Sequence, residues 1–268
     1  MHRVGSVPFI NALPLVWPAL AGDKRWDVHV DFRPPSQLPT LLADGEAEAI
    51  LVSSVEALRM PGARVASGIS ISSLKRVTSV RLVSKVSVDK IQTLALDENS
   101  MTSNLLAQVM LLETAGIRPK AETRKADVKT MLAEFDACVL IGDVGMQDTP
   151  APLRTIDLGA WWESAFKLPF VWALWVGREG MTPELANELQ WAKAQGTEHI
   201  HEAAQLGADR TGLPLKRVTD YLTQYVNFDL SPDHLKGLAL FGELLQKHNF
   251  EPLVTMPEIV EAGACCMA

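Results

Sequence analysis

The sequence lacks the features that mark several large classes of protein. Positive charge is scarce: 25 Lys and Arg stand against 32 Asp and Glu, and the net charge of −7 argues against a nucleic-acid partner. The longest apolar run near the C-terminal half, residues 170–176, is too short to span a bilayer. No leader with a charged start, a long apolar core and a small-residue cleavage site is visible. We therefore expect a cytoplasmic protein that contacts neither nucleic acid nor membrane.

Motifs for metal, nucleotide and nucleophilic chemistry are also missing. There is no G-x-G-x-x-G, no Walker phosphate loop and no G-x-S-x-G elbow. Cys138 lies in an apolar run typical of a buried thiol, and the adjacent Cys265 and Cys266 do not have a metal-ligand spacing. These absences leave pure binding, or chemistry that depends mainly on positioning the substrate, with no metal site.

The 268 residues do contain apolar strand candidates that alternate with helix-period segments, which is typical of an α/β protein. Strands are predicted at 3–7, 28–32, 49–52, 80–83, 93–96, 137–141 and 170–176. From Thr182 onward the sequence predicts only helices, at 183–206, 214–225 and 232–248.

This order predicts a chain that crosses twice between two lobes. Lobe I comprises residues 1–80 plus 177–268, with a helical C-terminal part, and lobe II comprises residues 81–176. A cleft at the crossings is a natural site for a small molecule. Ser79, one of several hydroxyl residues near the first crossing, is therefore a candidate site residue.

Asn11 is the polar group that the first strand presents. Pro8 and Pro14 lack backbone donors, so a regular central strand cannot run through this segment. A short strand followed by a rigid loop that carries the amide fits better, and loops at strand ends are common places for recognition groups.

Hydroxyl and carboxyl groups follow three other strands. Ser53-Ser54 end one strand, although hydroxyls often bond there to nearby backbone. Ser100, Thr102 and Ser103 stand at the start of an amphipathic helix, where they fit a helix cap and an anion site equally well. Asp143 follows Gly142, where it caps a turn or holds a hydroxyl-bearing ligand. Trp172 lies in an apolar run and is more typical of core than of a ring-stacking site.

Several short motifs occur in a fixed order between residues 3 and 176. They are Val4-Gly5, Asn11-x-Leu13-Pro14-Leu15, Pro35-Ser36-x-Leu38, Ile71-Ser72-Ser73, Ser79-Val80-x-Leu82-x-Ser84-Lys85, Ser100-x-Thr102-Ser103, Asp136-Ala137, Ile141-Gly142-Asp143, Asp157-Leu158-Gly159 and Leu168-Pro169-Phe170-Val171. As an ordered set they resemble the chorismate dehydratases of the futalosine route to menaquinone. The chain departs from that family's pattern at Lys75-Arg76, at Phe166-Lys167 and after Asp143.

The resemblance implies a two-lobed fold similar to the type II periplasmic binding proteins, with a ligand cleft between the lobes. It implies a cytoplasmic lyase that converts chorismate to 3-[(1-carboxyvinyl)oxy]benzoate and water. It also implies a small anionic substrate and a reaction without a metal or organic cofactor. It does not indicate the oligomeric state. The alternatives are the dihydroxynaphthoate synthase of the same route, which acts on a larger substrate, and a cytoplasmic binding protein for a small carboxylate.

On this hypothesis Asn11 and Ser79 are the catalytic residues. Asn11 holds the enolpyruvyl side chain so that its carboxylate takes the ring proton, and Ser79 bonds the departing hydroxyl or that carboxylate. Hydroxyl donors stabilise the charge that develops on the ring carboxylate. The expected substrate-binding residues are Ser53, Ser54, Ser100, Thr102, Ser103, Gly142, Asp143 and Phe170, and Asp143 is the alternative base.

Overall fold

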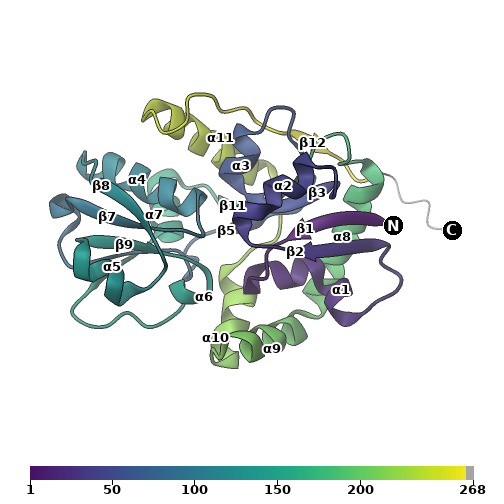
Figure 1. The fold of residues 1–268 in the computed structure, drawn as a ribbon, viewed down its shortest axis with the longest axis horizontal. Helices are drawn as coiled ribbons and strands as arrows, with labels where there is room; N and C mark the ends of the chain where they lie inside the picture. The colour runs from purple at the N-terminus through teal and green to yellow at the C-terminus, as the bar shows by residue number, and fades with distance from the viewer. Residues whose placement is uncertain (264–268) are drawn as a thin grey trace.

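Two β-sheets organise the computed structural model, which describes residues 1–263 (Figure 1). Sheet A has seven strands in the order β12-β4-β11-β3-β1-β2, with β5 paired to β11. Sheet B has five strands in the order β10-β6-β9-β7-β8. Cys265 and Cys266 lie outside the described residues.

Sheet A is built from both ends of the chain. Its strands are β1 (His2–Ser6), β2 (Val28–Phe32), β3 (Ala49–Ser53), β4 (Arg64–Ala66), β5 (Ile71–Ser73), β11 (Phe170–Gly177) and β12 (Glu258–Val260). β1 runs parallel to β2 and β3, and β11 runs antiparallel to β3. β3 and β11 are apolar along most of their length because strands in the middle of a sheet bury both faces.

Helices from the same segments cover sheet A. They are α1 (Trp17–Ala21), α2 (Leu38–Ala43), α3 (Ser54–Arg59), α8 (Pro183–Glu198), α9 (Ile200–Thr211), α10 (Leu215–Asp220) and α11 (Pro232–Lys247), with 3-10 turns at Ile10–Val16 and Pro35–Gln37 and a π-helical turn at Tyr221–Tyr225. The predicted starts after Thr182 and Ser231 are confirmed. Thr182 accepts a hydrogen bond from the Leu185 N–H at 3.3 Å, and Ser231 forms a capping box with His234.

Sheet B belongs to the middle of the chain. Its strands are β6 (Arg81–Ser84), β7 (Thr93–Asp97), β8 (Lys120–Arg124), β9 (Ala137–Leu140) and β10 (Arg154–Asp157). The helices of this part are α4 (Thr102–Ala115), α5 (Val128–Glu134), α6 (Gly142–Gly145) and α7 (Leu158–Phe166), with a 3-10 turn at Val88–Lys90. α4 begins at Thr102, as predicted, and ends at Gly116, whose φ of 66° suits glycine.

The chain passes between the sheets twice. The first passage leads from β5 to β6 through Thr78 and Ser79, and the second leads from β10 to β11 through α7. The predicted boundary at residue 176 assigned residues 170–176 to lobe II. The structure instead has β11 in sheet A, where it pairs with β3, β4 and β5. An apolar run with no polar alternation indicates a buried strand but carries no information about its partner.

An aromatic cluster joins β11 to the helices beside it. The ring of Phe170, which is 1% exposed, lies 4.9 Å from Trp162, 4.3 Å from Trp172 and 5.0 Å from Phe241 between centroids. These residues come from α7, β11 and α11, which are far apart in the sequence. The second passage is therefore held by packing in the core.

Removal of the Phe170 ring is expected to destabilise the protein. Phe170→Ala should lower the free energy of unfolding by about 3–5 kcal/mol because the cavity it leaves cannot close fully. Equilibrium urea unfolding measures the change. Phe32→Ala, at a ring that is 38% exposed, is the control and should cost about 1 kcal/mol or less. Equal costs for the two variants would contradict the assignment of Phe170 to the core.

Candidate functional site

A cavity of about 610 Å³ lies where the parts of the chain that carry the two sheets meet. Asn11 and Ser53 reach it from the sheet A part, Ser103 reaches it from α4, and Ser79 reaches it from the first passage. This volume lies in the range of sites for small organic molecules.

Most of the residues that the sequence singled out line this cavity. They are Asn11, Ser53, Ser79, Ser100, Thr102, Ser103 and Gly142. Ser54, Asp143 and Phe170 are not among the residues that line it. Trp172, Tyr221 and Asp97, which sequence analysis did not assign to the site, do line it.

Asn11 and Ser53 place buried polar atoms at the cavity. Asn11 Oδ1 and Ser53 Oγ are inaccessible and have no hydrogen-bond partner among the described residues. A buried polar atom left without a partner costs about 1–3 kcal/mol, so each such atom needs an explanation, and a bound ligand is one. Both side chains line the cavity, so a polar ligand there is one group that would supply the missing hydrogen bonds.

The 3-10 turn that carries Asn11 is tightly supported from behind. A Cβ atom at Gly196 of α8 would lie 1.8 Å from the Pro14 carbonyl oxygen, so only glycine permits this contact. Pro14 itself lies inside the turn and restricts its backbone. The amide of Asn11 therefore stands on a rigid support.

Ser79 forms a buried hydrogen bond with a residue that the sequence analysis missed. Its Oγ donates to Tyr221 Oη at 3.0 Å. Burial raises the pKa of the Tyr221 phenol, and the side chains of Ser79 and Asn11 oppose that shift. The phenol therefore keeps its proton at neutral pH. Tyr221 opens a π-helical turn, a distortion often found at functional sites, and no sequence motif marked it.

The backbone of Ser79 rests against α6. A Cβ atom at Gly145 would lie only 1.9 Å from the Ser79 carbonyl oxygen and 3.2 Å from that of Leu140. Glycine at position 145 thus permits the approach of α6 that supports Ser79.

The hydroxyls at the start of α4 have separate roles. Ser100 Oγ accepts a hydrogen bond from the Ser103 N–H at 3.2 Å, which is the capping role. Thr102 Oγ1 accepts from the Val55 N–H at 3.1 Å and lies 3.2 Å from Ser54 Oγ. Thr102 and Ser54 thus join the two parts of the chain at the edge of the cavity. Ser103 remains as a hydroxyl that lines the cavity at the positive end of the α4 dipole.

Asp97 and Asn104 hold the loop before α4. Asn104 Oδ1 accepts from the Asp97 N–H at 3.1 Å, and its Nδ2 donates to the Asp97 carbonyl at 2.8 Å. The Asp97 carboxylate accepts from the backbone of Asn99 at 2.9 Å and of Ile141 at 3.3 Å. Burial nevertheless raises the pKa of Asp97.

Two expected site residues occupy other positions. Phe170 is part of the aromatic core, and its neighbour Trp172 lines the cavity instead, donating from Nε1 to Ser73 Oγ at 3.1 Å. Asp143 lies in α6 and is not among the residues that line the cavity; burial raises its pKa, and the Ile10 N–H opposes the shift. All positions of this strand are similarly apolar, so the sequence does not show that Trp172 rather than Phe170 lines the cavity.

The cation at the cavity is already neutralised. Arg59 donates to Glu56 at 3.3 Å and also pairs with Glu251, and all three residues line the cavity. An anionic ligand would therefore be recognised mainly by hydroxyl, amide and phenol donors and by the start of α4.

Within residues 1–263 no three His, Cys, Asp or Glu side chains are grouped in a way that could hold a metal ion. None of the helices in this range is both long and apolar enough to cross a membrane.

Comparisons with known proteins show the family to which the chain is similar. The profile of a family described as menaquinone biosynthesis matches residues 2–247. Chorismate dehydratase of Thermus thermophilus is 31% identical over 231 residues, which cover 79% of this chain and 84% of that protein.

Solved structures share the fold. A protein from Archaeoglobus fulgidus superimposes with a TM-score of 0.73 at 19% identity and covers 93% of this chain and 98% of its own. The alkanesulfonate-binding protein SsuA from Xanthomonas axonopodis, bound to MOPS, has a TM-score of 0.67 at 15% identity, with coverage of 97% and 98%. The expected fold of the periplasmic binding proteins is confirmed.

The contact of α6 with Ser79 can be tested by adding one methyl group. Gly145→Ala should destabilise the protein by about 1–3 kcal/mol, because the methyl group meets a backbone carbonyl that cannot rotate away. Gly207→Ala in α9 is the control, since the three atoms nearest its Cβ would be side-chain carbons of Ile10 and Val218 at 3.2–3.3 Å rather than backbone. Urea unfolding compares the two, and a Gly145→Ala variant as stable as the parent protein would contradict the close approach.

Proposed function

Because the chain belongs to the menaquinone biosynthesis family that includes chorismate dehydratase, we propose that it converts chorismate to 3-[(1-carboxyvinyl)oxy]benzoate and water. The reaction is a carbon–oxygen lyase step, and we place it in the cytoplasm and in the futalosine route. The observation that carries the proposal is the cavity with unpartnered buried atoms of Asn11 and Ser53, beside the Ser79–Tyr221 pair. It suits a small polar substrate held by neutral donors.

Chorismate carries two carboxylates, a ring hydroxyl and an enolpyruvyl ether. The C–H bond at the ether-bearing carbon breaks, its proton passes to a base and its electron pair forms a ring double bond. The hydroxyl group leaves with the electrons of its C–O bond and takes up one proton, so that H⁺ and OH⁻ are lost together as one water. The ring becomes aromatic, which supplies the driving force. The enzyme therefore needs mainly to select this elimination and to hold the reacting conformer.

We place the ring carboxylate near Ser103 at the start of α4. The C–H bond that breaks is connected to this carboxylate through a ring double bond. Negative charge therefore spreads toward the ring carboxylate as the bond breaks. A helix N-terminus and a hydroxyl donor stabilise such charge without reorganising. Ser100 and Thr102 act by holding the start of α4 in place.

The enolpyruvyl carboxylate of the substrate acts as the base. Asn11 is suited to hold it, because an amide both donates and accepts hydrogen bonds and this one stands on a rigid turn. A base within the substrate has a high effective concentration. Asp143 is less suited, since its side chain is not among those lining the cavity.

Ser79 and Tyr221 are placed to assist the departing hydroxyl. Tyr221 Oη accepts from Ser79, so its own hydrogen is free to be donated to a group in the cavity. The dehydratase is also favoured over the dihydroxynaphthoate synthase and over a binding protein by the Thermus thermophilus relative, which is a chorismate dehydratase.

Incubation of the purified protein with chorismate tests the function directly. Absorbance and mass spectrometry should show an enolpyruvyl benzoate that has lost one water. If calorimetry shows that chorismate binds but its mass does not change, the protein is a binding protein and the proposal fails.

The roles of Asn11 and Ser79 predict large losses of turnover. Asn11→Ala and Ser79→Ala should each lower kcat about 100-fold or more, as removal of one positioned hydrogen-bonding group typically does. The fold should be retained, as judged by circular dichroism. Ser164→Ala, at an exposed serine of α7, is the control and should leave kcat unchanged. Near-normal turnover in both site variants would reject the assignment.

Asp143→Asn separates the two candidate bases. If the substrate supplies the base, this variant should keep kcat within about tenfold of the parent enzyme, because Asp143 does not line the cavity and the amide that replaces it has a similar shape. Single-turnover measurements with chorismate provide the rate. Complete loss of the reaction in a folded variant would make Asp143 the base.

A further inference from the structure

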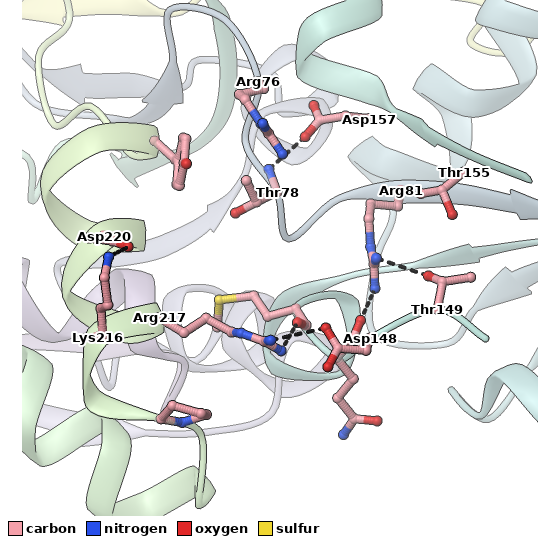
Figure 2. A pocket seen from close by; sticks show the side chains of 14 residues that line it. Arg76, Thr78, Arg81, Asp148, Thr149, Thr155, Asp157, Lys216, Arg217 and Asp220 are labelled. Atoms are coloured by element: carbon pink, nitrogen blue, oxygen red, sulfur yellow. Dashed lines mark hydrogen bonds and ion pairs between the residues drawn. The ribbon is translucent and has the colours of Figure 1, made fainter. Parts of the chain in front are cut away.

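A second cavity, of about 630 Å³, lies next to the first passage between the sheets (Figure 2). Arg76 and Thr78 line it from the passage, Arg81 lines it from β6, and Lys216 and Arg217 line it from α10. It shares none of its lining residues with the cavity described above.

The two cavities nevertheless adjoin along the chain. Thr78 and Asp220 line the second cavity, whereas the next residues, Ser79 and Tyr221, line the first. Ser79 and Tyr221 hydrogen-bond to each other at 3.0 Å. The walls of the two cavities are thus connected through this pair.

Four cationic side chains line the second cavity, although the chain as a whole carries a net charge of −7. Two of them are paired: Arg217 with Asp148 at 2.9 Å and Lys216 with Asp220 at 2.6 Å, and Figure 2 shows both pairs. The remaining acidic residue there, Asp157, is engaged by backbone donors.

The bonds of Asp157 leave its carboxylate little capacity for a cation. It accepts from the Val77 N–H at 3.1 Å, from the Thr78 N–H at 2.7 Å and from the Ala160 N–H at 3.0 Å. In this way Asp157 ties the passage to the start of α7. No carboxylate of the described residues lies within 4 Å of the charged nitrogens of Arg76 or Arg81.

Arg81 is oriented by neutral acceptors. Its two Nη atoms donate to Thr149 Oγ1 at 3.0 Å and to the Gln147 carbonyl at 2.5 Å, while its buried Nε has no partner within residues 1–263. Burial lowers the pKa of Arg81, the charges of Asp157 and Asp148 oppose that shift, and the charge of Arg217 adds to it. The nearby carboxylates of Asp148 and Asp157 are engaged by other donors, so Arg81 has no directly paired carboxylate. An anion in the cavity would supply that pairing.

We propose that this second cavity is a ligand site for a small oxyanion of at least two negative charges, bound chiefly by Arg76 and Arg81. Guanidinium groups bind carboxylate and phosphate oxygens through paired hydrogen bonds, which fits either kind of oxyanion.

An anion in this site would join three parts of the molecule: the passage, sheet B and α10. Because Thr78 and Asp220 precede Ser79 and Tyr221, such an anion would restrain the Ser79–Tyr221 pair from behind. Occupancy of the second cavity is thereby coupled to the geometry of the first.

Calorimetric titration of the full chain with citrate and, separately, with inorganic pyrophosphate tests the site at about 0.15 M salt. At least one probe should bind, and the tighter one shows whether carboxylate or phosphate oxygens are preferred. Arg76→Glu should weaken that binding at least about tenfold, because it reverses a charge at the ligand. Lys75→Glu is the matched control: it makes the same charge change at the adjacent exposed side chain, which lines neither cavity, and should alter the affinity less than about twofold.

The variants also distinguish the sites. Arg76 is exposed, so the melting temperature of Arg76→Glu should match that of the parent protein, and Arg76→Gln should weaken binding by a smaller factor. The proposal is overturned if neither probe binds at millimolar concentration, if Lys75→Glu loses as much affinity as Arg76→Glu, or if Asn11→Ala abolishes binding while Arg76→Glu does not. Chorismate turnover enters none of these outcomes, so they are independent of the proposed function.

Discussion

The hydrogen bond between Ser79 and Tyr221 is the contact on which the geometry of the cleft depends. It links the first passage between the sheets to the helical segment that follows α10, and these segments are 142 residues apart in the sequence. Its position requires α6 to approach the backbone of Ser79, which glycine at position 145 permits. One buried bond thus relates groups from both ends and from the middle of the chain, and the amide of Asn11 lies beside it at the same cavity.

Features of the fold with a local cause were predictable from the sequence, whereas those with a distant cause were not. Thr182 and Ser231 begin helices because each caps the backbone a few residues ahead, so the signal and the structure lie together. The partner of β11 depends instead on strands about 100 to 125 residues earlier. The sequence therefore indicated a buried strand correctly and put it on the wrong side of the predicted lobe boundary.

The same distinction explains the site. Asn11 and Ser53 stand out in the sequence because each follows an apolar strand, and Ser79 because it lies near the predicted crossing between the lobes. The structure brings all three to one cavity. Tyr221 does not stand out, since an aromatic residue in an amphipathic helix is usually core. Its hydrogen bond with Ser79 and its place in the cavity lining, both set by tertiary structure, reveal it. Phe170 was misassigned because the apolar run that contains it does not show that Trp172 faces the cavity.

The neutrality of the cleft donors bears on the proposed chemistry. An arginine held against the enolpyruvyl carboxylate would bind it tightly but would also lower its pKa, and a weaker base removes a ring proton more slowly. An amide such as Asn11 orients the carboxylate at less cost to its basicity. Arg59, the cation at the cavity, is engaged by Glu56 and Glu251, so its charge is largely cancelled. Orientation by dipoles, with little net positive charge near the base, is what a substrate-assisted elimination requires.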